Sequence, residues 1–331
     1  MKIAFFGSDL IDKQKYRSLL RDHTVDFFDQ NLTDDNIPGK KDFDVISVSV
    51  KSEVGKKIIE YFPDLKMISV RATGFDKIDV NFANEKKILV CNVPGYGSHT
   101  VEEFTFGLML SLTRNIFQAI NRVKNEKSFG SRDLMGRDLF GMNLGVIGTG
   151  KIGANVIKIA KGFGMIVLAY NPHPNETLAG DLGFKYVSLE ELLKKSDIIT
   201  LHCSLNDRTF HLINKHSFFL MKDGALMINT ARGAVVDTYA LLDALKSKKL
   251  AGAGIDVLEK EEYMGSDIDK MSSEIESIIE ANLELINLPN VLVSPHIAFD
   301  TVLAQQTIIE TTVENILAFI KGSPVNIVNE K

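Results

Sequence analysis

The stretch that decides the fold of this 331-residue chain reads Asn143-Leu144-Gly145-Val146-Ile147-Gly148-Thr149-Gly150-Lys151-Ile152-Gly153. The residues Asn143–Ile147 are expected to form a buried strand. The glycine motif that begins at Gly148 follows it and opens a helix that runs to Phe163. A G-x-G-x-x-G pattern alone is a weak signal, but between a strand and a helix it has a mechanism. Gly148 would make the tight turn, Gly150 would let the backbone approach a pyrophosphate, and Gly153 would bring helix and strand together. The helix N-terminus offers free N–H groups to the phosphates, so the stretch predicts dinucleotide binding.

Strand-like runs rich in Val, Ile and Phe alternate with helix-like stretches on both sides of this turn, which predicts parallel sheets covered by helices. The predicted strands are Lys2–Phe6, Asp44–Val50, Met67–Arg71, Ile88–Val93, Asn143–Ile147, Ile166–Tyr170, Asp197–His202, Ala225–Asn229, Ala253–Val257 and Val291–Val293. Helical spacing of apolar residues marks Glu53–Tyr61 and Val80–Lys86. The length is too great for one ordinary core and predicts two domains.

Three segments depart from this rhythm. Val101–Lys124 is apolar and periodic, and with the polar loop Asn125–Arg137 it reads either as a bridge between domains and candidate dimer contact, or as a buried spine helix. Glu259–Leu288 reads as an acidic helical insertion between two strands. The last helix, Thr301–Lys321, is expected to fold back onto the first domain.

Composition excludes several classes of protein. With 45% hydrophobic and 24% charged residues the chain has the composition of a soluble globular protein. Its formal net charge of -5 disfavours non-specific binding to nucleic acid or an anionic membrane. No apolar run is long enough to span a membrane, and the N-terminus leads into a strand, not a signal peptide. The two cysteines indicate reduced, cytoplasmic thiols, and too few Cys and His lie close together for a metal site.

The residue after the strand Ile166–Tyr170 bears on the choice of dinucleotide. An acidic residue there would hold the adenosine ribose 2′-hydroxyl, but this chain has Asn171. Asparagine can still bond a hydroxyl, although it does not repel a 2′-phosphate. Residues 172–182 supply no Arg or Lys to bind that phosphate. The sequence therefore predicts NAD as the cofactor, with weakened discrimination against NADP.

Three segments that follow predicted strands carry side chains suited to chemistry. Arg232 follows Ala225–Asn229, the acidic run Glu259–Glu262 follows Ala253–Val257, and His296 follows Val291–Val293. Arginine can pair a substrate carboxylate through two hydrogen bonds, and histidine can exchange a proton near neutral pH. A neighbouring carboxylate would hold the histidine in one tautomer and raise its pKa. Taken singly, each is more often a solvated charge or a structural residue. Their joint appearance after consecutive strands, downstream of a nucleotide turn, favours a hydride-transfer site.

These segments resemble the D-isomer-specific 2-hydroxyacid dehydrogenases, and within that family the D-lactate dehydrogenase branch. The resemblance runs from about Met67 to Phe319. It rests on three motifs that together are specific to the family: Gly148-Thr149-Gly150-Lys151-Ile152-Gly153, Asn229-Thr230-Ala231-Arg232-Gly233 and Ser294-Pro295-His296-Ile297-Ala298.

The resemblance implies a role for each catalytic residue. Arg232 would bind the substrate carboxylate and keto oxygen, His296 would shuttle the proton, and Glu261, five residues after Asp256, would be the partner of the histidine. Glu259 and Glu262 are left without a role. The amides of Thr73 and Gly74 would receive the substrate carboxylate, with Tyr96 on the substrate side. Cofactor contacts are expected at Gly148, Thr149, Gly150, Lys151, Ile152, Gly153, Asn171, Cys203, Ser204, Thr209, Thr230, Ala231 and Asp256.

The resemblance also implies two doubly wound parallel-sheet domains with a cleft between them that closes over substrate. Residues 1–99 with 300–331 would form a flavodoxin-like substrate domain, and residues 100–299 a Rossmann NAD-binding domain through which a homodimer forms. The expected activity is reduction of pyruvate to D-lactate with NADH. Departures from the family at Phe104, Ser204 and Asp300 leave other substrates open: larger 2-keto acids, glyoxylate or hydroxypyruvate. A nucleotide-sensing corepressor and a catalytically silent paralogue are the alternatives of a different class.

Overall fold

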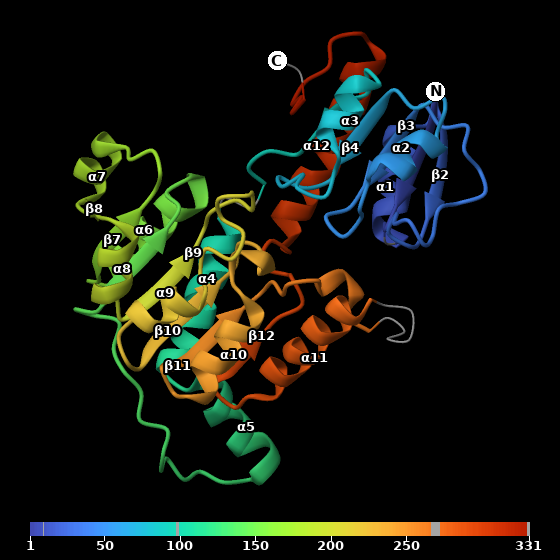
Figure 1. Cartoon of the computed structure of the whole chain (residues 1–331). Coiled ribbons are helices and arrows are strands. Elements are labelled where there is room, and N and C mark those ends of the chain that lie inside the picture. Colours follow the sequence, from blue (N-terminus) through green and yellow to red (C-terminus); the bar gives the residue numbers. More distant parts are fainter. Residues whose placement is uncertain (9, 97–98, 266–271, 330–331) are drawn as a thin grey trace. The chain divides into compact units, whose positions relative to one another are not determined.

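The computed structural model describes residues 1–8, 10–96, 99–265 and 272–329, and they form two compact units (Figure 1). Unit 1 is Met1–Tyr96 with Asp300–Lys331, and unit 2 is Gly97–Phe299. Each unit is built on one sheet whose strands all pair in parallel. The predicted fold class, two parallel-sheet α/β domains, is confirmed.

Unit 1 has the strand order β2-β1-β3-β4-β5, the flavodoxin-like doubly wound order. Its strands are β1 (Lys2–Phe6), β2 (Thr24–Phe28), β3 (Val45–Val48), β4 (Met67–Val70) and β5 (Leu89–Cys91). Its helices are α1 (Leu10–Leu19), α2 (Lys56–Tyr61), α3 (Val80–Glu85) and α12 (Val302–Ile320). Four of the five strands match predicted ones, whereas the edge strand β2 was not predicted.

Both faces of the unit 1 sheet are buried, because alternate side chains of each strand point to opposite sides. Ile3 and Phe5 of β1 pack with Ile309 and Val313 of α12, while Ala4 and Phe6 pack on the opposite side. The α12 helix, red in Figure 1, therefore belongs to unit 1 with the blue N-terminal strands.

The segment after α12 is also fixed to this sheet. The side chain of Asn329 accepts a bond from the Val90 amide and donates one to the Ile88 carbonyl, each at 2.8 Å. Inside the same unit, Asn315 of α12 donates to the Asn92 carbonyl at 2.8 Å. Unit 1 is thus assembled from two pieces of chain that are remote in sequence.

Unit 2 contains a sheet of seven strands in the order β12-β11-β10-β9-β6-β7-β8. The chain reverses its direction of winding at β6, the strand that precedes the glycine turn, which is the arrangement of a Rossmann sheet. The strands are β6 (Asn143–Ile147), β7 (Ile166–Tyr170), β8 (Lys185–Tyr186), β9 (Ile198–Leu201), β10 (Ala225–Asn229), β11 (Leu250–Ile255) and β12 (Val291–Val293). Only the two-residue β8 lacks a predicted counterpart.

Helices cover both faces of this sheet. One face carries α4 (Thr100–Thr113), α6 (Lys151–Gly162) and α7 (Glu176–Leu182); the other carries α8 (Leu189–Lys195), α9 (Lys215–Leu220), α10 (Thr238–Lys246) and α11 (Ser273–Asn287). The prediction of helix throughout Val101–Lys124 was wrong. Asn115, in the left-handed region at φ 51, separates α4 from α5 (Ile116–Glu126). The α4 helix is the buried spine of unit 2, packed on β10 and β11.

The predicted acidic insertion Glu259–Leu288 is helical only in parts. A short 3-10 helix covers Glu261–Tyr263, and α11 begins at Ser273, where the Ser272 side chain caps it. Residues 266–271 lie outside the described part of the chain.

Candidate active site

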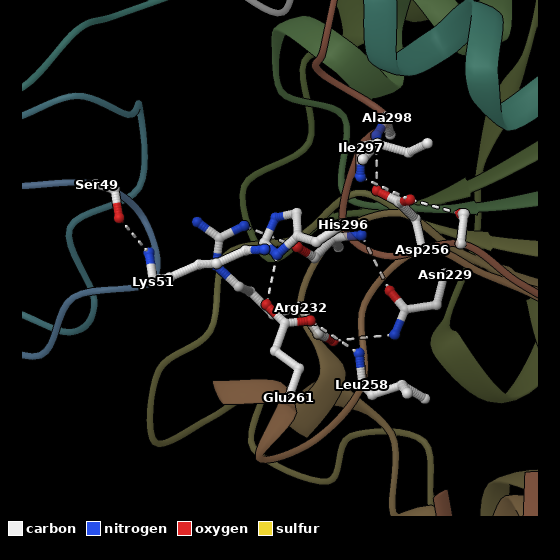
Figure 2. A network of polar contacts seen from close by, with 12 residues as sticks. Ser49, Lys51, Asn229, Arg232, Asp256, Leu258, Glu261, His296, Ile297 and Ala298 are labelled. Carbon is white, nitrogen blue, oxygen red and sulfur yellow. Dashed lines mark hydrogen bonds and ion pairs between the residues drawn. The ribbon is translucent and has the colours of Figure 1, made fainter. Parts of the chain in front are cut away.

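Three adjacent strands of unit 2 deliver the predicted catalytic side chains to one edge of the sheet. Within the sheet, Asn229 of β10 pairs with Ile255 of β11, which pairs with Val293 of β12. Arg232 and His296 each lie three residues beyond this register line, and Glu261 lies six beyond it. Figure 2 shows the three side chains at this carboxyl edge, where ligands of open α/β sheets bind.

The Glu261 carboxylate and the His296 imidazole form a direct pair. Glu261 Oε1 lies 2.5 Å from His296 Nδ1, and both side chains are partly buried. An ionised carboxylate only accepts hydrogen bonds, so Nδ1 carries the hydrogen of this contact. The second oxygen, Oε2, accepts from the Leu258 amide at 3.1 Å, which fixes the carboxylate to its own loop. This arrangement leaves the Nε2 atom of His296 as the position for proton exchange with a ligand.

Asp256 shapes the loop that carries His296. Its carboxylate accepts from the Ser294 hydroxyl at 2.6 Å and from the amides of Ile297 and Ala298 at 3.0 and 2.8 Å (Figure 2). The His296 amide donates to the Asp256 carbonyl at 2.8 Å, with the backbone of His296 in the left-handed region at φ 57. Burial raises the pKa of the Asp256 carboxyl, and the three donors oppose that effect. Asp256 therefore fixes the backbone on both sides of His296.

A polar side chain on β10 likewise forms the turn that carries Arg232. The Asn229 amide oxygen accepts from the Ala231 N–H at 3.0 Å, and its nitrogen donates to the Arg232 carbonyl at 3.0 Å. This is an Asx turn, a device in which a side chain replaces a backbone turn partner. The Arg232 Nη1 atom donates to the Ala231 carbonyl at 2.8 Å. Sequence reasoning assigned no role to Asn229, although an asparagine at a strand end followed by a turn is a recognisable signal.

The glycine turn has the shape that a dinucleotide needs. Gly148 has φ 93, and a Cβ there would lie 2.7 Å from the His202 carbonyl. A Cβ on Gly153 would lie 2.0 Å from the Gly148 carbonyl oxygen, whereas one on Gly150 would meet no described atom within 4 Å. Among the described residues, no side chain caps the N-terminus of α6, so the first N–H groups of this helix are available to a phosphate. The residues present therefore fit the pyrophosphate of NAD.

The other residues predicted to contact the cofactor lie around this turn or at the strand ends beside it. The Thr149 hydroxyl bonds the Tyr186 hydroxyl at 2.7 Å, and Asn171 donates to the His173 carbonyl at 2.6 Å. The Thr230 hydroxyl bonds Thr105 of α4 at 2.9 Å. Burial raises the pKa of the Cys203 thiol to about 11, so the thiol stays protonated at neutral pH.

The loop after β9 carries the remaining predicted cofactor contacts. The Thr209 hydroxyl donates to the Ser204 carbonyl at 2.7 Å and so closes this loop on itself. Its start is formed by His202, whose Nε2 bonds the Thr200 hydroxyl at 2.9 Å. Burial lowers the pKa of His202 from 6.5 to about 3, so a neutral imidazole lies beneath the glycine turn.

The residues predicted to bind substrate belong to unit 1. Thr73 and Gly74 follow β4, and the Thr73 hydroxyl donates to the Val93 carbonyl at 2.9 Å. The Asn92 side chain donates to the Thr73 carbonyl at 2.7 Å, which ties this segment to the end of β5. Tyr96 is the last residue of the N-terminal part of this unit.

Glu259, which the family resemblance leaves without a role, is a buried and bonded carboxylate. This residue is only 7% exposed, and its carboxylate is bonded by His211 and Thr238. An acidic run does not reveal which of its carboxylates turns inward, so this contact could not be predicted from the sequence.

None of the helices in the described residues has both the length and the apolar content needed to cross a membrane. Within the same residues, no group of three or more His, Cys, Asp and Glu side chains is arranged to hold a metal ion.

Comparison with known proteins agrees with this geometry. Residues 106–298 match the family model described as D-isomer specific 2-hydroxyacid dehydrogenase, NAD binding domain. The chain is 35% identical over 327 residues to D-lactate dehydrogenase of Escherichia coli, covering 97% of this chain and 98% of that protein. It is 37% identical over 297 residues to glyoxylate reductase of Thermococcus litoralis, covering 88% and 85%.

A solved structure extends the likeness to the whole fold. The D-lactate dehydrogenase of Aquifex aeolicus, solved in complex with NAD and lactic acid, is 36% identical and superposes with a TM-score of 0.91 over 99% of each chain. Sequence, fold and site geometry together show that this chain belongs to the D-isomer-specific 2-hydroxyacid dehydrogenases, a family of NAD-dependent oxidoreductases.

Proposed function

We propose that this protein reduces pyruvate to D-lactate with NADH, with Arg232, Glu261 and His296 as its catalytic residues. The observation that carries the proposal is the contact of 2.5 Å between Glu261 and His296, at the same sheet edge as Arg232. The likeness to D-lactate dehydrogenases of two organisms supports pyruvate as the substrate. The bound cofactor supplies the hydride to the keto carbon.

Each catalytic side chain has a task that its surroundings allow. The Arg232 guanidinium pairs the substrate carboxylate and polarises the keto oxygen, because its planar fork matches both. His296 holds a proton on Nε2 and delivers it to the oxygen that becomes the hydroxyl. Glu261 keeps the opposite ring nitrogen protonated and stabilises the imidazolium form before that transfer. In the reverse direction His296 takes the proton back.

We propose further roles for the remaining predicted residues. The backbone amides of Thr73 and Gly74 would receive the substrate carboxylate, with Tyr96 on the substrate side. Unit 1 would then be the substrate domain and unit 2 the NAD-binding domain. These roles rest on the family resemblance and on the chemistry of the groups.

The experiment that tests the reaction is an NADH-oxidation assay with purified protein. Pyruvate, 2-ketobutyrate, phenylpyruvate, oxaloacetate, glyoxylate and hydroxypyruvate are compared by kcat/KM, and the product is resolved by chiral chromatography. The highest kcat/KM for pyruvate with a D-product is the expected result. A clear preference for glyoxylate, the reaction named for the Thermococcus relative, would refute the substrate while keeping the reaction class. NADH binding without turnover of any keto acid would favour a corepressor-like or silent protein.

We also propose that the protein is a cytoplasmic homodimer that associates through unit 2. The α5 helix and the segment after it project from the rest of unit 2 in Figure 1. All eleven residues of α5 are described, and none of them is buried. Two of its apolar side chains are well exposed, Phe117 at 59% and Ile120 at 49%. An exposed apolar surface of this kind marks an association site. Light scattering is expected to give the mass of a dimer, and Phe117→Asp with Ile120→Asp to give that of a monomer.

A further inference from the structure

Glu259 lies two residues before the proposed histidine partner, yet it points into the protein. His211 Nε2 lies 3.0 Å from Glu259 Oε1, and the Thr238 hydroxyl donates to Oε2 at 2.8 Å. The Glu259 backbone carbonyl accepts from the Asn282 side chain of α11 at 2.8 Å. Three separate segments of unit 2 therefore hold one residue of the loop after β11 from both its side chain and its backbone.

The residues that follow Glu259 turn the chain sharply back toward His296. Lys260 has φ 57, in the left-handed region, and a 3-10 turn begins at Glu261. Inside this loop, the Leu258 amide donates to Glu261 Oε2 at 3.1 Å. Because the turn is so short, the position of Glu261 depends on how the backbone at Leu258 and Glu259 is held.

The same backbone supports the segment that carries Arg232. A Cβ on Gly233 would lie 2.1 Å from the carbonyl carbon of Leu258 and 2.3 Å from the Glu259 nitrogen. Gly233 therefore rests directly on the peptide between Leu258 and Glu259. Displacement of that peptide would therefore shift both the segment that carries Arg232 and the side chain of Glu261.

A buried carboxylate is costly, and an apolar side chain of similar volume is often no less stabilising. What a fully bonded buried carboxylate offers instead is one defined geometry. We propose that Glu259 is a positioning residue of this active site. Held by His211 and Thr238, it fixes the loop after β11 so that Glu261 reaches His296. This inference rests on the catalytic roles proposed above for Glu261 and His296.

His211 extends the same anchor toward the predicted cofactor loop. Its ring stacks on Phe210 with centroids 4.0 Å apart, and its amide donates to the Ala234 carbonyl at 2.9 Å. The loop closed by Thr209 ends two residues before His211. Through His211, the Glu259 carboxylate therefore joins the segment expected to bind cofactor to the segment expected to hold the proton-transfer pair.

The test is a double-mutant cycle on kcat between Glu259→Ala and Glu261→Ala, because only coupled residues depart from additivity. Glu259→Ala alone should lower kcat for pyruvate about 100-fold, as expected when a catalytic group moves by about 1 Å. In the Glu261→Ala background the same change should alter kcat by less than about 2-fold. Glu259→Gln keeps an acceptor for Thr238, so it should restore kcat to within about 10-fold of the unmodified protein.

Two controls separate positioning from general loss of stability. Glu284→Ala removes an exposed carboxylate that pairs with Lys246, and it should leave kcat unchanged. Leu193→Ala truncates a side chain that is 1% exposed in the same unit. It should lower the unfolding midpoint, but its effect on kcat should not depend on whether Glu261 is present. If Glu259→Ala does not fold, Thr238→Val, which removes one donor only, replaces it in the cycle.

Hydrogen exchange of the segment 256–263 in the protein without ligands gives a readout that needs no turnover. Faster exchange in Glu259→Ala, confined to this segment, supports the anchor. If the unmodified protein reduces none of the keto acids, the proposed function fails and exchange alone decides on the anchor. The inference is overturned by unchanged exchange, by kcat within about 2-fold of normal, or by an equal loss of kcat in both backgrounds.

Discussion

Gly153→Ala is the substitution with the clearest consequence for the nucleotide turn. The added Cβ would lie 2.0 Å from the Gly148 carbonyl oxygen, whereas ordinary contacts begin at 3.4 Å. Because that neighbour is backbone, α6 must move away from β6 by more than an ångström. Overpacking of this kind costs about 1 to 3 kcal/mol, while the better helix propensity of alanine returns about 1 kcal/mol. The free energy of unfolding should therefore fall by up to about 2 kcal/mol.

The displaced helix should also bind NADH less well. Loss of one charge-assisted bond between a backbone N–H and the pyrophosphate costs about 1.5 to 3 kcal/mol, which is about 10- to 100-fold in Kd. Isothermal titration calorimetry measures the affinity, and urea unfolding followed by circular dichroism measures the stability, since the chain has no tryptophan.

Gly150→Ala is the matched control for this experiment. Its Cβ would meet no described atom within 4 Å, and its φ of -66 suits any residue. The free energy of unfolding should change by no more than about 1 kcal/mol, while NADH affinity should fall because the methyl group takes the space of the pyrophosphate. Normal NADH affinity in both variants would refute the assignment of this turn to the cofactor.

Four further outcomes follow from the site. His296→Ala should lower kcat at least about 100-fold and leave the Kd of NADH unchanged, because it removes the proton donor and not the cofactor site; near-normal turnover would remove His296 from the mechanism. Arg232→Lys should lower kcat/KM for pyruvate strongly, because a point charge cannot reproduce the bidentate fork; an unaltered kcat/KM would contradict this role. Asn171→Asp should weaken NADPH binding relative to NADH in calorimetry, since a carboxylate repels the 2′-phosphate; equal weakening of both would place the ribose elsewhere. Since the pKa of His202 is about 3 when folded and about 6.5 when unfolded, the unfolded chain takes up a proton first as the pH falls. Stability should thus drop by about 2 kcal/mol between pH 7 and pH 5, and His202→Gln should reduce that drop in urea unfolding; an equal drop in the variant would point to other groups.

The sequence predicted strands well where both faces of a strand are buried. The bounds of β1, β6 and β10 match the predicted ranges, because buried parallel strands are continuous apolar runs. The edge strand β2, Thr24–Phe28, is only partly buried and contains a polar alternation, so it gave no such run. β8 is too short to give any pattern.

The helical segment after the first domain shows a different limit. Apolar periodicity continues from α4 into α5, because α5 keeps an apolar face although none of its residues is buried. Periodicity therefore could not reveal the break at Asn115. A single left-handed asparagine is a local backbone event that leaves no trace in the spacing of apolar residues.

In the candidate site, sequence reasoning identified side chains by type and by their place after strands. The structure brings Glu261 and His296 into contact across 35 residues of sequence. The contact between Glu259 and His211 spans 48 residues of sequence. It depends on the direction of the Glu259 side chain, next to the left-handed backbone of Lys260. Choosing Glu261 over its neighbours rested on the family resemblance, because three carboxylates within four positions look alike in a sequence.

The divided construction of unit 1 has a consequence for how the chain is made. The bonds from Asn329 to Val90 and Ile88 join residues separated by 239 and 241 positions. A ribosome adding about 5 to 20 residues per second needs about 10 to 40 s to produce the intervening unit 2. During that time the first 96 residues lack α12, which covers Ile3 and Phe5. The nascent N-terminal part therefore leaves this apolar sheet face partly uncovered while unit 2 folds, and aggregation is the hazard of that stage.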